Sequence, residues 1–259
     1  MASHGKPKKQ QPPKTVPFAP PTDLRVTYTH AAGAQKIGNL DIPDGALILP
    51  IGKVELLDGT VVSYQGPNVV AFNLLEAREH QKRAAKLRES VLKQLKPADD
   101  GTLRVTNMTV LFDYLSDAST SVLMSYAAIE GFCNALIDNL ADGTQVTVER
   151  KGLAVVYGKD EMARRLSTSE KLHIVAPIAT GTASVKGTVP WEGFVRLRRL
   201  RDDLVHIKGF GYAGEASNPQ AYGRLLRGEG DGAVQEAGRV VLAIQPDWIK
   251  EPVRKKLGL

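Results

Sequence analysis

The sequence contains a single cysteine, Cys133, among its 259 residues. One cysteine cannot form an internal disulfide, which favours a reducing compartment, and no cysteines or histidines have the spacing of a structural zinc site. The N-terminus lacks the apolar core of a signal peptide, and no segment approaches the roughly 20 apolar residues of a membrane span. We therefore expect a cytoplasmic protein with no membrane contact, no metal and no cofactor.

Acidic residues are missing from the first 22 positions, although the whole chain carries a net charge of +6. Four lysines in this stretch contribute +4 of that charge, so the rest of the chain is close to neutral. The stretch is rich in proline and glutamine and poor in apolar residues, so it cannot repay the entropy of ordering. Residues 1–22 are therefore predicted to be a disordered basic tail, which either binds RNA loosely or keeps the protein soluble.

Two hairpins are predicted in the remaining chain. Residues 23–66 alternate short β-like runs with turn residues, and Asp58-Gly59 between two apolar runs is a strong hairpin signal. Residues 145–157 carry a similar pattern around Lys151-Gly152 and lie between helical stretches. The sequence therefore predicts a β-rich N-terminal segment over residues 23–66 and a second hairpin inserted into a helical domain.

Apolar residues recur with helical spacing in most of the chain after residue 66. The long stretches cover residues 68–96, 107–140, 190–207 and 233–244, the second with a break near residues 116–121. Asn68 is a good N-cap for the first stretch, and Pro190 occupies a favoured first-turn position in the third. These patterns predict a mainly α-helical domain over residues 67–249 and a C-terminal tail over residues 250–259.

The first helical stretch is basic, and Lys82, Arg83 and Lys86 stand close together in it. Cations on one helix can contact the phosphates of RNA. A solvated helix face explains the same three residues equally well. They are therefore a weak candidate for an RNA-binding surface.

Two charged residues fall on or beside apolar helix faces. Projection at about 100° per residue places Arg201 beside the stripe of Leu197, Leu200 and Leu204. A guanidinium next to the core is costly unless it meets an acceptor. The same projection places Glu130 within the apolar face of the helix over residues 107–140, with Asn134 one turn further. We therefore expect Glu130 to pair with Arg201 and Asn134 to complete the polar patch.

His206 follows Arg201 in the same helix but points elsewhere. In a straight helix it lies about 140° around the axis from Arg201 and about 7.5 Å further along it. A two-fold dimer that laid this helix against its copy would bring both residue types together. Unwinding at the end of the helix would also reorient His206.

A purely structural interpretation of this helix is also open. Arg198 with Asp202, and Arg199 with Asp203, have the i,i+4 spacing of helical ion pairs. A histidine near the C-terminus of a helix is favoured by the helix dipole. Both features would stabilise the helix without any chemistry.

The motif Arg201-Asp202-Asp203-Leu204-Val205-His206 resembles that of the HEPN superfamily, an arginine, a polar residue, a short spacer and a histidine. Residues 126–134 resemble the glutamate-bearing helix of that family, and Ser169-Glu170-Lys171-Leu172 is also similar to it. The resemblance covers about residues 68–245. It implies a HEPN-like helical bundle, with the β-rich N-terminal segment and the inserted hairpin as additions.

The resemblance implies a metal-independent endoribonuclease that works as a homodimer in phage defence or in a toxin system with an antitoxin. RNA supplies its own nucleophile, the 2′-hydroxyl. The implied roles are proton transfer by His206, stabilisation of phosphate charge by Arg201 and orientation by Asp202. The alternative is a catalytically inactive HEPN-like module that binds RNA or a protein partner.

Overall fold

The structure is a computed structural model that describes residues 22–27, 29–30, 35–37, 40–44, 46–206 and 220–259. The predicted basic tail lies outside these residues except for Thr22, as does the expected end of the third long helix at Ile207. The chain divides into two units, residues 1–23 with 27–66, and residues 24–26 with 67–259. The division after residue 66 agrees with the predicted limit of the β-rich segment.

The smaller unit contains antiparallel strand pairs. These are β1 (Thr29–His30) with β4 (Leu47–Ile48), β2 (Gln35–Ile37) with β3 (Leu40–Ile42), and β5 (Ile51–Glu55) with β6 (Val61–Gln65). The hairpin predicted around Asp58-Gly59 is confirmed, because β5 and β6 flank it. Asp58 Oδ1 accepts a hydrogen bond of 2.9 Å from the Thr60 N–H, and Gly59 has a φ of 82°, which favours glycine.

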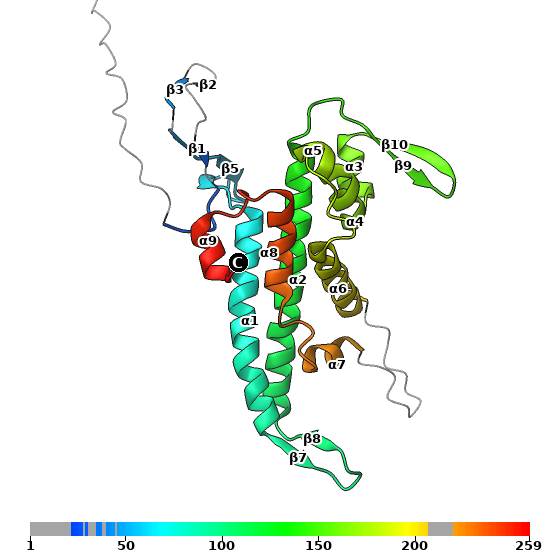
Figure 1. Ribbon diagram of the computed structural model, residues 1–259. Coiled ribbons are helices and arrows are strands. Elements are labelled where there is room, and N and C mark those ends of the chain that lie inside the picture. Colours follow the sequence, from blue (N-terminus) through cyan, green and yellow to red (C-terminus); the bar gives the residue numbers. More distant parts are fainter. Residues whose placement is uncertain (1–21, 28, 31–34, 38–39, 45, 207–219) are drawn as a thin grey trace, which may run out of the picture. The chain divides into compact units, whose positions relative to one another are not determined.

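The larger unit is mainly α-helical, as predicted, with two small strand pairs (Figure 1). Its helices are α1 (Val69–Lys93), α2 (Met108–Asp138), α3 (Lys159–Arg165), α4 (Thr168–Glu170), the π-helical turn η1 (Lys171–Val175), α5 (Ala176–Thr180), α6 (Val189–Val205), α7 (Gln220–Leu226), α8 (Ala233–Ile244) and α9 (Glu251–Leu257). Its strands are β7 (Leu95–Pro97), β8 (Leu103–Val105), β9 (Val146–Arg150) and β10 (Leu153–Tyr157).

The two longest helices, α1 and α2, run side by side and form the centre of this unit (Figure 1). Each begins at an asparagine whose side chain caps it: Asn68 Oδ1 accepts from the Ala71 N–H at 3.0 Å, and Asn107 Oδ1 from the Val110 N–H at 3.2 Å. α1 ends at Lys93 rather than Lys96, because the next residues pair as β7 with β8.

The break predicted near residues 116–121 is wrong, since α2 is continuous there. Thr120 Oγ1 donates to the Ser116 carbonyl at 2.8 Å, so this hydroxyl is satisfied within the helix. By length and composition α2 could cross a membrane, contrary to the expectation that no segment approaches a span. In its most apolar stretch, however, 56% is buried inside the structure, which accounts for the apolar residues as core.

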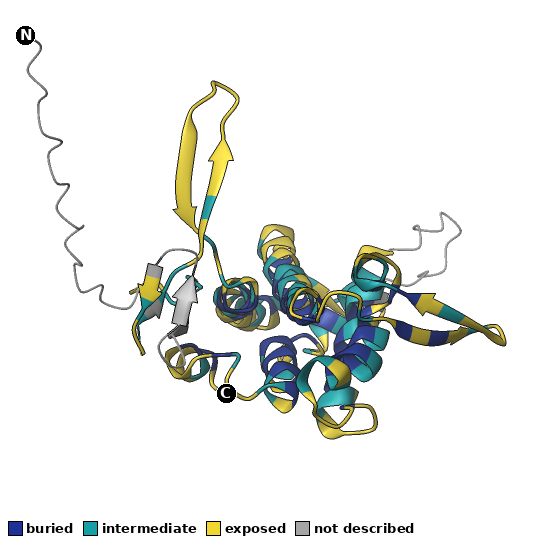
Figure 2. Ribbon diagram, turned by 90° about the horizontal axis from the view of Figure 1, so that it is seen from above, coloured by how far each residue is buried: buried dark blue, intermediate teal, exposed yellow. Residues whose placement is uncertain are grey.

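Buried residues lie on the sides of the helices that face one another, and exposed residues lie on the outer sides (Figure 2). The main cluster joins α1, α2, α6 and α8 around side chains such as Leu74, Phe132, Phe194 and Val241. A smaller cluster joins β9 and β10 to α3 and the end of α2. The inserted hairpin is confirmed, and Lys151 and Gly152 have the positive φ angles of 50° and 79° that its tight turn requires.

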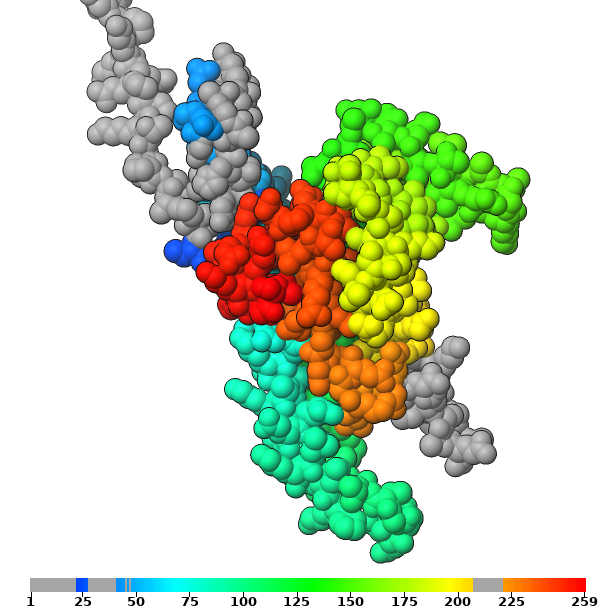
Figure 3. Space-filling view, viewed as in Figure 1, coloured from blue at the N-terminus to red at the C-terminus, as the bar shows by residue number. Residues whose placement is uncertain are grey.

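Residues 250–259 are not a tail, contrary to the prediction. Residues 251–257 form α9, which packs against α1 and lies beside α8 (Figure 3). Val253 and Leu257 are 3% and 0% exposed and belong to the main core, and Gln235 Nε2 of α8 donates to the Leu257 carbonyl at 3.3 Å. One pair of apolar residues spaced i,i+4 is too short a pattern to predict a helix. Its burial depends on the surface that α1 and α8 provide.

Candidate functional site

The HEPN-like motif occupies the last turns of α6. Leu197 and Leu200 are buried and fasten the helix to the core, whereas Leu204 is partly buried. Val205 is the last helical residue and His206 is the C-cap, with φ of −109° and ψ of 52°. The His206 N–H still bonds to the Asp202 carbonyl at 2.9 Å, and its side chain is exposed. The helix therefore ends at His206, where the backbone leaves the helical direction.

The guanidinium of Arg201 lies over the ring of Tyr126 on α2, with 4.8 Å between its Cζ and the ring centroid. Nη1 also forms an ion pair of 3.0 Å with Asp202 Oδ1. The side chain of Arg201 is 28% exposed, so it lies at the edge of the core, as the projection predicted. A cation over an aromatic face is stabilised by the ring quadrupole, which keeps the charge of the guanidinium intact.

Glu130 does not pair with Arg201, so this part of the prediction is wrong. Its Oε1 accepts a hydrogen bond of 3.2 Å from Thr168 Oγ1 of α4. Thr168 also lies near the phenol of Tyr126. Two neutral side chains thus separate the two charges. Helical projection gave the correct faces, but it could not show that the start of α4 inserts between α2 and α6.

Tyr126 is the residue that Arg201 and Glu130 share. Burial raises the pKa of its phenol, and the Glu130 carboxylate acts in the same direction. The charge of Arg201 lowers that pKa and offsets part of the rise. The phenol therefore remains protonated near neutral pH and can donate a hydrogen bond.

Asn134 does contribute to a polar patch, but its partner is Lys171. Lys171 Nζ donates to Asn134 Oδ1 at 2.8 Å and to the Ala163 carbonyl at 2.7 Å. Lys171 is only 8% exposed, and burial lowers the pKa of its amine, while Glu130 partly restores it. A lysine is usually solvated, so the buried position of Lys171 could not be predicted from the sequence.

The π-helical turn η1 directs Lys171 inward. Pro177 has no N–H, and its ring would clash with the carbonyl four residues earlier in a regular α-helix. The wider turn relieves that clash, and the Ala176 N–H bonds to the Lys171 carbonyl. Pro177, ten residues after the N-cap Ser167, is a visible signal of irregular helix, but its effect on Lys171 depends on packing.

The two i,i+4 ion pairs expected on α6 do not form. Asp203 Oδ2 accepts from Arg224 Nη1 of α7 at 2.6 Å, and Arg224 Nε also meets Glu229 Oε2 at 2.6 Å. Arg198 donates to a serine hydroxyl of α4 instead of to Asp202. Contacts with neighbouring elements thus replace the pairs within the helix. They hold the last turn of α6 against α7.

The three basic residues of α1 do not join Arg201. α2 packs against both α1 and α6 and lies between them (Figure 1). Lys82 pairs with Glu79 at 2.9 Å and Arg83 with Asp117 at 3.1 Å, whereas Lys86 is exposed. Two of the three charges are therefore neutralised locally.

Among the residues that the structure describes, no group of three or more His, Cys, Asp or Glu side chains could hold a metal ion. The site that the structure assembles is thus a set of cations and hydrogen-bonding groups on α6, α2 and α4, with His206 at the end of α6. No family model, no curated protein and no solved structure matches the chain.

Proposed function

We propose that the protein is a metal-independent endoribonuclease of HEPN type, which acts as a homodimer in the cytoplasm. The proposal rests on the motif from Arg201 to His206 and on the resemblance that it carries. Phage defence or a toxin system with an antitoxin is the biological setting that this resemblance implies.

The observation that supports it best is the environment of Arg201. A buried pair with Glu130 would hold the guanidinium within the core and away from a substrate. Instead, an aromatic ring and a half-exposed aspartate hold it at the edge of the core. Arginine has five N–H donors, of which the pair with Asp202 uses one, so others remain for a phosphate.

The reaction needs a base, an acid and stabilisation of negative charge. The 2′-hydroxyl of RNA attacks the adjacent phosphorus, and the 5′-oxygen of the next nucleotide leaves with a proton. His206 moves a proton to or from one of these oxygens, a task suited to imidazole near neutral pH. Arg201 stabilises the charge that develops on the phosphate, and Asp202 fixes the guanidinium in place.

The second copy of the chain is proposed to complete the site. Val205, between Arg201 and His206, is 49% exposed although it is apolar. A two-fold contact that laid α6 on its copy would cover Val205 and bring His206 of one chain near Arg201 of the other.

The experiment is cleavage of single-stranded RNA by the purified protein in EDTA. We expect wild type to cut, and His206→Ala and Arg201→Ala to lose at least about a hundredfold in rate, as expected when a general acid–base group or a charge-stabilising group is removed. Arg199→Ala is the matched control, because Arg199 is exposed on the same helix. Absence of cutting by wild type, or equal rates in all variants, would refute the nuclease.

A catalytically inactive module that binds RNA or a protein partner is the second candidate. The ion pair of Arg201 with Asp202 favours this candidate, because a guanidinium already paired with a carboxylate stabilises the charge on a phosphate less well. Wild type that binds the same RNA in a separate binding measurement, but does not cleave it, would support this candidate.

A further inference from the structure

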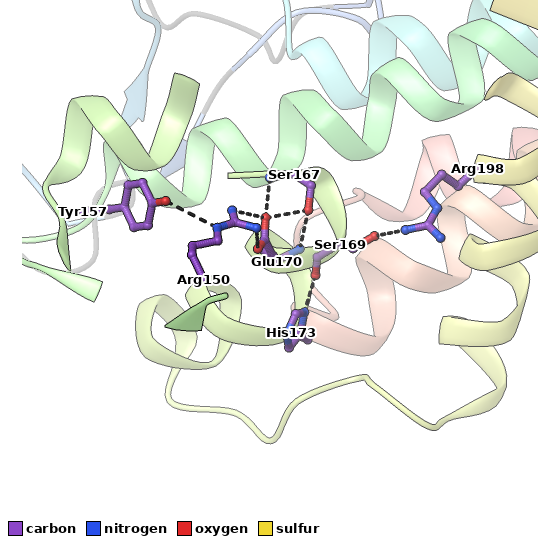
Figure 4. A network of polar contacts seen from close by, with 7 residues as sticks. All are labelled: Arg150, Tyr157, Ser167, Ser169, Glu170, His173 and Arg198. Carbon is purple, nitrogen blue, oxygen red and sulfur yellow. Dashed lines mark hydrogen bonds and ion pairs between the residues drawn. The ribbon is translucent and has the colours of Figure 1, made fainter. Parts of the chain in front are cut away.

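A second arginine of α6, Arg198, takes part in a polar network with α4 and η1 (Figure 4). Its Nη1 donates to Ser169 Oγ at 2.5 Å. The Ser169 carbonyl accepts from His173 Nδ1 at 2.6 Å, and a carbonyl can only accept, so Nδ1 carries the hydrogen. Ser169 therefore fixes the positions of Arg198 and His173 on its two sides, as Figure 4 shows.

The described partners of Arg198 are neutral. They are the hydroxyl of Ser169 and the ring of Phe194, whose centroid lies 5.9 Å from the guanidinium Cζ. Other arginines of this helix meet carboxylates, as Arg196 does with Glu236 at 2.7 Å. Arg198 is thus positioned by groups that leave its positive charge uncompensated, an arrangement suited to an anion.

Arg198 and Arg201 lie on neighbouring positions of one helix side. Residues three apart in an α-helix differ by about 4.5 Å along the axis and about 60° around it. Arg198 contacts Ser169 of α4, and Arg201 lies over the ring of Tyr126 on α2. Two cations so placed can contact consecutive phosphates of a single strand.

We propose that Arg198 binds the phosphate of the nucleotide next to the one whose phosphate Arg201 contacts. The inference rests on the proposed function for its ligand, single-stranded RNA. It adds a subsite that extends the contact with RNA from the end of α6 toward α4. One N–H of the guanidinium holds Ser169, and the remaining donors face the phosphate.

The experiment measures binding of a fluorescent single-stranded 2′-O-methyl RNA, which lacks the nucleophile, at a series of salt concentrations. Loss of a charged hydrogen bond should make Arg198→Ala bind about tenfold or more weakly. Loss of one phosphate contact should also reduce the slope of log affinity against log salt by about 0.7. Arg199→Ala, which removes an exposed charge from the adjacent position, should keep affinity and slope within error.

Ser169→Ala separates the phosphate contact from a structural role. It removes the hydrogen bond to Arg198 but leaves the charge, so the slope should stay at the wild-type value. If Arg198→Ala keeps the wild-type slope, or if wild type binds no RNA, the inference is overturned. Cleavage of unmodified RNA is measured separately: wild type that binds with an Arg198-dependent slope but never cuts would refute the nuclease and support the subsite.

Discussion

Arg201 and Glu130 are separated by Tyr126 and Thr168, so the two charges do not pair with each other. The ring of Tyr126 lies under the guanidinium, and the hydroxyl of Thr168 donates to the carboxylate. A buried pair with Glu130 would hold Arg201 away from a phosphate, whereas at the edge of the core its pair with Asp202 uses one N–H and leaves other donors for a phosphate.

The separation of the two charges predicts that their contributions to stability add. Glu130→Ala should cost about 1–3 kcal/mol in the free energy of unfolding, because it leaves the buried hydroxyl of Thr168 without its acceptor. Arg201→Ala should cost about 1 kcal/mol, since its contacts are partly exposed. The double variant should differ from the sum by no more than about 1 kcal/mol in denaturant titrations, because the two residues share Tyr126 but do not pair with each other. A coupling energy well above that value would show that Glu130 and Arg201 interact directly.

Because the thiol of Cys133 is buried, we expect the protein to lose stability at alkaline pH. Burial raises the pKa of its thiol from 9.0 to about 12. Between these values the unfolded chain releases the proton and the folded chain keeps it, so stability is full below pH 9 and falls as pH rises. Relative to Cys133→Ala, wild type should lose about 1.4 kcal/mol per pH unit above that point. Ser125→Ala, at another buried position of α2, should follow wild type.

The exposed side chain of Val205 is expected to lie in the proposed dimer contact. Val205→Asp should leave the folded monomer nearly as stable as wild type, because the side chain is 49% exposed. Its charge should prevent α6 from packing on its copy, so light scattering should report a monomer and RNA cleavage should be lost. Ile178→Asp, at an apolar residue of α5 that is 52% exposed, is the matched control and should stay dimeric. A wild-type protein that is monomeric at all concentrations would remove the composite site.

From the ion pair between Asp203 and Arg224, we expect α7 to stabilise the end of α6. Their ion pair of 2.6 Å joins the last turn that carries the motif to a neighbouring helix. Asp203→Asn should raise the hydrogen exchange rates of amides near His206 while those in α2 stay unchanged. Arg224→Lys should raise these exchange rates less. The lysine keeps a positive charge for Asp203, but it has no planar fork with which to bridge Asp203 and Glu229. Unchanged exchange in both variants would assign the order of this turn to packing alone.

The sequence located the long helices and both hairpins because local interactions define them. Asn68 and Asn107 cap helices with their own side chains, and Gly59 and Gly152 allow turns that other residues disfavour. It failed at α9 and at the expected break in α2. In both places burial against another helix decided the outcome, and burial is not a local property.

The sequence by itself determined which faces of α2 and α6 carry Glu130 and Arg201, because the helical period fixes direction around the axis. Only the tertiary structure decided what each charge meets. The start of α4 inserts Thr168 and Ser169 beside these faces, and η1 turns Lys171 toward Asn134. The height and rotation at which neighbouring helices pack select the partner, and those follow from the whole core.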